Sequence, residues 1–150
     1  MKYITVHCSA TPPSMDIGVE EIRKMHLAKG WSDVGYHEII RRDGTRESGR
    51  PVWRTGAHVK GHNRYNIGIS LVGGVDEHGK AETNFTEEQY SALREAINHY
   101  VGIYGIPLEN IKGHRDWFPD INGDGIIDER DWLKDCPCFS VQDLLESWRV

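Results

Sequence analysis

The pattern of apolar and polar positions predicts several β-strands. Residues 3–7 alternate so that Tyr3, Thr5 and His7 share one face of a strand. The apolar run at 67–72 is typical of a buried central strand. Shorter strands are predicted at 36–41, at 45–48 after a turn at 42–45, and at 111–113, just before His114.

Helical spacing of apolar residues predicts three helices. The first covers residues 19–29, where Val19, Ile22, Met25 and His26 fall near one face and Gly30 ends the helix. Thr86 and Gln89 form a capping box that opens a long helix to about Tyr104. Ser140 is expected to cap the last helix. With no internal repeat and no interdomain linker, residues 1–150 are expected to form one α/β (α+β) domain, a central mixed β-sheet flanked by helices.

Length and charge exclude several functions. A chain of 150 residues can bury a core without disulfides. Its formal net charge of −5 is spread along the chain without a basic block, which argues against nucleic acid as a partner. No apolar run is long enough to span a membrane, and the first residues lack the apolar segment of a secretory signal. We therefore expect a protein made in the cytoplasm, without membrane insertion and with reduced thiols.

Candidate metal ligands are scattered along the chain. His7 ends one predicted strand, His114 follows another, and Cys136 and Cys138 precede the last helix. Two imidazoles and one thiolate suit zinc, and three protein ligands leave a fourth tetrahedral position for water. Such an open site suits amide hydrolysis. These residues alone leave both cysteines as candidates, and packed or surface histidines are the alternative.

Seven ordered segments resemble the type 2 N-acetylmuramoyl-L-alanine amidases. They are TVHCSAT (5–11), GWSDVGYH (30–37), IRRDGT (40–45), GAH (56–58), NIGISLVGG (66–74), GHRD (113–116) and KDCP (134–137). The pattern is most similar to the phage lysozyme-like zinc amidases, and the peptidoglycan recognition proteins share their fold. The resemblance covers nearly the whole chain apart from an acidic loop at 120–131. It implies the amidase type 2 fold.

The resemblance also implies roles for individual residues. His7, His114 and Cys136 match the zinc ligands, and Cys136 is preferred to Cys138 because Lys134 and Pro137 stand where the family pattern has a Lys and a Pro. Tyr36 and Lys134 match the catalytic tyrosine and lysine of the family. The segments that line the substrate groove contain His37, His58 and Asn63.

The implied activity is zinc-dependent hydrolysis of the amide bond between N-acetylmuramic acid and L-alanine in peptidoglycan. The protein is expected to act as a monomer on the cell wall, after release or export, in lysis of the endolysin type or in remodelling. Two alternatives stay open. One is a peptidoglycan-binding module without catalysis, and the other is a phage regulatory protein that binds a polymerase.

The segment DINGDGIIDERD, residues 120–131, resembles a calcium-binding EF-hand loop. The predicted ligands are Asp120, Asn122, Asp124, Ile126 (through its carbonyl), Asp128 and Asp131. Asp131 replaces the usual bidentate Glu, and Pro119 disfavours a helix before the loop. The alternative is an acidic turn without metal. Because the loop lies between His114 and Cys136, we expect it to stiffen the connection between these two candidate ligands.

Four histidines receive no role from the resemblance and are expected to be solvated: His26, His62, His78 and His99. Cys8 follows His7 on the strand, so it should point to the opposite face and into the core. Cys138 is expected to be a small buried residue. Arg115 and Asp116 are either supports for His114 or surface charges.

Overall fold

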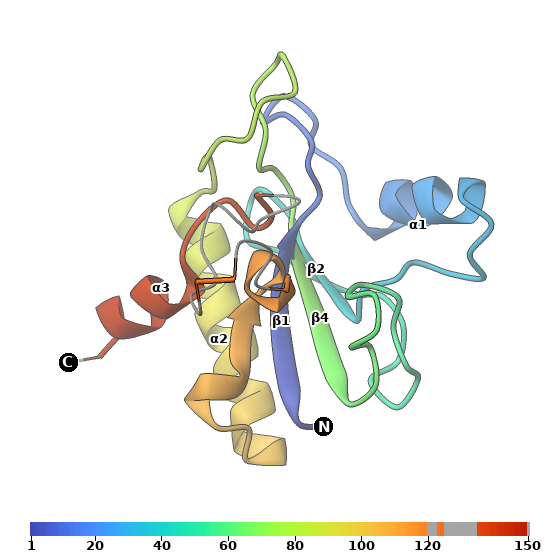
Figure 1. Ribbon diagram of the computed structural model, residues 1–150. Coiled ribbons are helices and arrows are strands. Elements are labelled where there is room, and N and C mark those ends of the chain that lie inside the picture. Colours follow the sequence, from blue (N-terminus) through green and yellow to red (C-terminus); the bar gives the residue numbers. More distant parts are fainter. Residues whose placement is uncertain (120–122, 125–134, 150) are drawn as a thin grey trace.

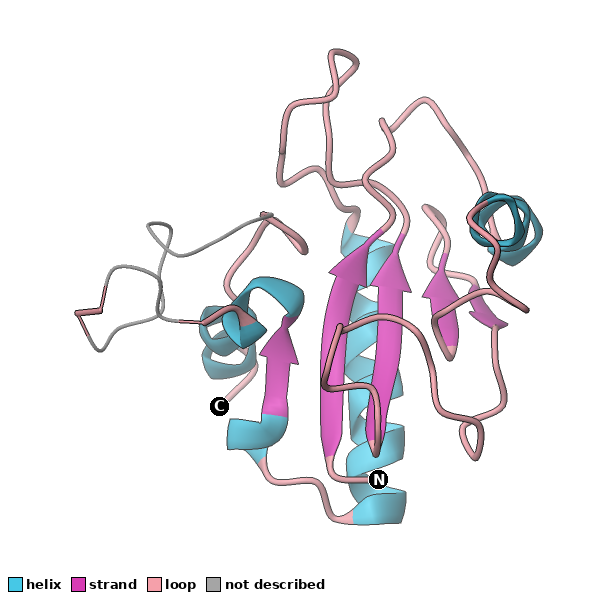
Figure 2. Ribbon diagram, turned by 45° about the vertical axis from the view of Figure 1, so that its right-hand side comes forward, coloured by secondary structure: helices cyan, strands magenta, loops and turns pink. Residues whose placement is uncertain are grey.

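A five-stranded sheet forms the centre of the molecule. The computed structural model describes residues 1–119, 123–124 and 135–149. The strands are β1 (Tyr3–Cys8), β2 (Glu38–Ile40), β3 (Arg46–Ser48), β4 (Asn66–Leu71) and β5 (Ile111–Gly113). Their order in the sheet is β3-β2-β4-β1-β5. All neighbours pair in parallel except β2 and β3, which pair antiparallel, so the arrowheads of β1, β4 and β5 lie at the same edge (Figure 2). The predicted mixed sheet is confirmed.

The helices pack around this sheet. They are α1 (Val19–Ala28), α2 (Glu87–Tyr104) and α3 (Val141–Ser147), with short 3-10 helices η1 (Leu108–Asn110) and η2 (His114–Trp117) on either side of β5. The long helix α2 lies behind β1 and β4, and α1 lies on the β2 side of the molecule (Figure 1). No described helix is both long enough and apolar enough to cross a membrane.

The two faces of β1 have different roles. Ile4 and Val6 are fully buried and belong to the main core, which continues into Leu93 and Ile97 of α2. A smaller core joins α1 to the opposite face of the sheet through Ile22, Val34, Ile39 and Val72. Thr5 and His7 are also buried but lie on the face away from α2, because successive side chains of a strand alternate. The sheet therefore presents polar side chains on the face opposite its main core.

The capping box predicted for α2 is present, and it has a second function. The backbone N–H of Gln89 donates to Thr86 Oγ1 over 3.1 Å, and the backbone N–H of Thr86 donates to Gln89 Oε1 over 3.0 Å. Gln89 is fully buried, and its amide nitrogen also donates to the carbonyls of Ile40 and Val72. One side chain thus caps α2 and ties it to the ends of β2 and β4.

The strand predicted at 36–41 is shorter in the structure, where β2 begins at Glu38. Tyr36 and His37 precede it in an irregular segment. The carbonyl of Tyr36 still accepts from Arg50 N, and His37 N donates to the carbonyl of Gly68.

Candidate metal centre and active site

Two histidines meet where β1 and β5 end. Val6 of β1 is paired with Gly113 of β5, so His7 and His114 leave the sheet as neighbours. Their ring centroids are 4.6 Å apart. Asp116 Oδ2 accepts from the N–H of Gly113 over 2.8 Å and so holds the η2 turn that begins at His114. This contact favours the interpretation of Asp116 as a support for His114 over that of a surface charge.

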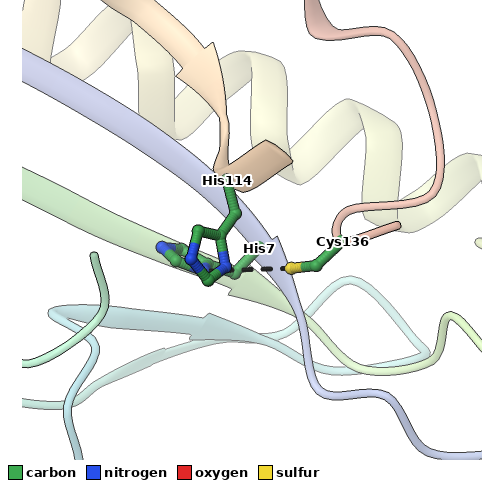
Figure 3. A group of neighbouring side chains, drawn as sticks. All are labelled: His7, His114 and Cys136. Carbon is green, nitrogen blue, oxygen red and sulfur yellow. Dashed lines mark hydrogen bonds between the residues drawn. The ribbon is translucent and has the colours of Figure 1, made fainter. Parts of the chain in front are cut away.

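Cys136 completes the group from a distant segment (Figure 3). Its Sγ lies 3.9 Å from His7 Nδ1 and accepts from the backbone N–H of Cys8 over 3.2 Å. Its carbonyl accepts from Arg115 N over 2.9 Å. A Cβ on Gly113 would lie 2.8 Å from Cδ of Pro137, so the lack of a side chain there allows the cysteine segment to approach β5.

The donor set fits zinc. The ligand atoms of His7, His114 and Cys136 all lie within 4.8 Å of one another. Zn–N and Zn–S bonds of roughly 2.0 and 2.3 Å place two tetrahedral ligands about 3.5 Å apart, close to the spacing seen between His7 and Cys136. The three residues predicted as zinc ligands are therefore brought together.

Cys138 lies in a different environment. Its Sγ donates to the carbonyl of Gly74 over 3.2 Å, and it is not one of the three grouped ligands. Cys8 is 5% exposed, as predicted for a core residue. Its hydrogen bond with the Cys136 thiol, together with burial, raises the pKa of Cys8 to about 12, so Cys8 stays a neutral thiol near pH 7.

Tyr36 lies beside the grouped ligands. Its ring centroid is 5.0 Å from that of His7 and 5.4 Å from that of His26. Burial, followed by the neighbouring Cys136 and Cys8 thiols, raises the pKa of the Tyr36 phenol above its usual value. The side chain thus carries a proton at neutral pH next to the candidate metal centre. Lys134, the other predicted catalytic residue, lies outside the described residues.

Two cavities open at this site. One of about 430 Å³ is lined by the three grouped ligands and Tyr36. The other, of about 650 Å³, has aromatic walls made by Trp31, Trp117 and Phe118. His58 and His114 line both cavities. Their size and mixed apolar and polar walls are typical of a binding site for a small molecule or a short chain.

The three residues predicted to bind substrate make internal hydrogen bonds. His37 is buried, its Nδ1 accepts from Gly68 N over 3.0 Å, and its Nε2 lies 2.8 Å from the carbonyl oxygen of Arg54. His58 Nδ1 lies 2.9 Å from His7 Nε2, and His58 Nε2 lies 2.9 Å from the Asn66 carbonyl. Asn63 Oδ1 accepts from the backbone N–H groups of residues 58 and 59. Contacts of the two histidines with substrate would therefore use ring carbons, and their substrate-binding roles stay predictions.

Comparison with known proteins decides the family. The family model described as N-acetylmuramoyl-L-alanine amidase matches residues 1–137. The chain belongs to this amidase family. It is 47% identical over 137 residues to the endolysin of Enterobacteria phage K11, covering 91% of the chain and 80% of the relative. Among solved structures it is similar to the N-acetylmuramoyl-L-alanine amidase LysC from Clostridium intestinale URNW, with a TM-score of 0.74, 25% identity and coverage of 97% and 83% of the two chains.

The fold is also confirmed by a more distant structure. Bumblebee PGRP-SA is 21% identical to this chain, with a TM-score of 0.72, and the alignment covers 98% of this chain and 81% of that one. The predicted amidase type 2 fold is therefore confirmed. The family model and the endolysin relatives show that the chain is an N-acetylmuramoyl-L-alanine amidase that acts on peptidoglycan.

Most of the acidic loop of the amidase lies outside the described residues. Asp120, Asn122, Ile126, Asp128 and Asp131 are among the residues not described. Asp124 is described and exposed. The calcium site gains no support from the part of the chain that the structure describes.

His26 is a residue of the site that sequence reasoning missed. It was expected to be solvated, but it is 7% exposed and lines the smaller cavity of the amidase. Its Nδ1 accepts from Gly35 N over 2.8 Å, and its ring contacts Trp31 and Tyr36. The signal was present in the sequence, because His26 lies four residues after buried Ile22 and so falls on the inner face of α1.

The buried His26 predicts a loss of stability in acid. Burial lowers its pKa from 6.5 to about 4 in the folded amidase, so the unfolded chain binds the proton more tightly. Neutral His26 therefore contributes to the free energy of unfolding. This contribution is complete above pH 6.5 and is lost as the pH falls toward 4, and it amounts to about 3 kcal/mol at most. His26→Asn keeps an acceptor for Gly35 N but does not titrate. Denaturant unfolding between pH 7 and pH 4 should show the wild type losing stability relative to this variant, whereas a constant difference would contradict the assignment.

Proposed function

We propose that this amidase hydrolyses the bond between N-acetylmuramic acid and L-alanine with zinc held by His7, His114 and Cys136. The observation that carries the proposal is the convergence of two imidazoles and one thiol, within 4.8 Å, in the wall of a cavity. When bound, zinc supplies a Lewis acid that polarises the amide carbonyl and lowers the pKa of a water molecule.

The residues of the chain supply the rest of the chemistry. Tyr36 holds a proton at its phenol oxygen beside His7, in position to orient a nucleophilic water or to pass a proton to the departing amine. Lys134, assigned from the family resemblance, would stabilise the negative charge that develops on the carbonyl oxygen. The aromatic walls of the larger cavity would restrict water around a bound muramoyl peptide.

A catalytic function is preferred to a binding module without catalysis. Recognition of peptidoglycan needs neither a thiol nor a buried phenol, whereas Cys136 and Tyr36 both lie against His7. We further propose that the chain works as a single amidase domain and as a monomer, and that it acts on the bacterial cell wall as an endolysin, the name carried by its phage K11 relative.

Removal of zinc is the direct test. Purified amidase should release stem peptides with a free L-alanine amino group from cell walls, and dialysis against a zinc chelator should abolish this release. Zinc added back should restore the rate, and calcium added back should not, because the hard calcium ion does not prefer imidazole and thiolate ligands. The measurement is new amino groups per mole of enzyme, alongside elemental analysis. Full activity in a preparation shown to contain no zinc would rule out the proposal.

A further inference from the structure

The candidate ligand His7 has its two ring nitrogens in different environments. Nδ1 is the nitrogen that lies 3.9 Å from Cys136 Sγ, on the side of the candidate metal centre. Nε2 lies 2.9 Å from Nδ1 of His58. An imidazole can bind a metal only through a nitrogen that carries a lone pair, so His7 must hold its proton on Nε2 if Nδ1 is the ligand atom.

The second partner of His58 determines where these protons lie. Nε2 of His58 is 2.9 Å from the carbonyl oxygen of Asn66, and a carbonyl oxygen only accepts. Nε2 of His58 therefore donates. In a neutral imidazole the other nitrogen then accepts, so His58 Nδ1 receives the Nε2 proton of His7. The direction of both hydrogen bonds follows from one backbone carbonyl.

The position of Asn66 is itself fixed from both sides. It is 1% exposed, and its Oδ1 accepts from Thr5 Oγ1 over 2.8 Å. Its Nδ2 donates to the carbonyl of His62 over 2.9 Å. The carbonyl that orients His58 thus belongs to a residue tied both to β1 and to the loop before β4.

His58 also needs a glycine beneath it. A Cβ on Gly68 of β4 would lie 2.7 Å from Cγ and 2.8 Å from Nδ1 of His58, closer than a side chain allows. Asn63 Oδ1 fixes the backbone of the His58 segment through hydrogen bonds of 2.8 Å to residues 58 and 59. The His58 ring is therefore held close to Gly68 of β4, with its plane at 80° to the ring of His7 and the two ring centroids 5.0 Å apart.

We infer that His58 is a positioning residue that fixes the tautomer of His7, so that the Nδ1 lone pair of His7 faces the metal. The inference rests on the proposed function, because it concerns the zinc site named there. It gives His58 a role that differs from contact with substrate. Supporting hydrogen bonds of this kind raise metal affinity by roughly 10–100-fold in other metal sites.

The test compares zinc affinity in His58→Leu and His58→Asn. Leucine fills similar space but cannot accept from His7, whereas the Asn side-chain oxygen stands close to the place of Nδ1 and can accept. By competition with a chromophoric chelator, His58→Leu should bind zinc roughly 10–100-fold more weakly than the wild type, and His58→Asn should recover most of the loss.

The outcomes separate this inference from the proposed function. A wild-type protein that binds no zinc overturns both. A wild type that binds zinc while His58→Leu binds it as tightly, and shows only a raised KM, overturns the positioning role and makes His58 a substrate contact. If His58→Leu fails to fold, nitrogen-15 NMR of the zinc-loaded wild type decides: the inference expects the proton of His7 on Nε2, and a proton on Nδ1 overturns it.

Discussion

Replacing Cys136 with alanine should abolish zinc binding and amidase activity while leaving the fold intact. The change removes one of three ligands, so zinc affinity should fall by more than the roughly 10–100-fold expected from loss of a supporting hydrogen bond. The fold should survive because the contact of residue 136 with Arg115 uses the backbone carbonyl, which alanine retains. Elemental analysis, peptide release from cell walls and circular dichroism measure the three quantities.

Cys138→Ala is the matched control for this experiment. It removes a thiol two residues away that donates to the Gly74 carbonyl and is not grouped with the histidines. Zinc content and activity should stay at wild-type levels. If Cys138→Ala loses zinc and Cys136→Ala keeps it, the two cysteines exchange roles and the ligand assignment is reversed.

The grouping of the three candidate metal ligands could be predicted from the sequence more completely than the residues around them. Strand alternation predicted a buried Cys8, and Cys8 is 5% exposed, while Ile4 and Val6, in the same phase of β1, belong to the main core. The choice between Cys136 and Cys138 came from the family resemblance, because both lie in one irregular segment where no periodicity fixes the direction of a side chain. That choice depends on a contact with the end of β1, more than a hundred residues earlier in the chain, where Cys8 N donates to Cys136 Sγ.

The hydrogen-bond partners of the histidines could not be predicted either, because they too come from segments far apart in the chain. The bond between His7 and His58 joins residues 51 positions apart and exists only because β1 pairs with β4 and the His58 loop folds back over Gly68. His26 was detectable in principle from the face of its helix, but its partner Gly35 lies in a loop without a regular pattern. Local patterns therefore predict elements and faces, whereas side-chain partners depend on packing between distant segments.

Tyr36→Phe should lower kcat by roughly 10²–10⁴-fold, the usual effect of losing a general acid or base. Phenylalanine keeps the ring that contacts His7 and His26, so zinc content and melting temperature should change little. The lost oxygen is the group that would orient water or move a proton. Peptide release under saturating cell-wall substrate measures kcat, and elemental analysis confirms that the metal is retained.

Tyr100→Phe separates a catalytic effect from the general loss of a buried hydroxyl. Tyr100 is 8% exposed and donates to Glu38 Oε2 over 2.8 Å, on the α2 side of the sheet. Losing a hydrogen bond to a carboxylate should cost about 1.5–3 kcal/mol of stability. Its kcat should stay unchanged, because the hydroxyl lies on the opposite face from the metal ligands. Wild-type kcat in Tyr36→Phe, or an equal fall of kcat in both variants, would show that the Tyr36 phenol takes no part in the reaction.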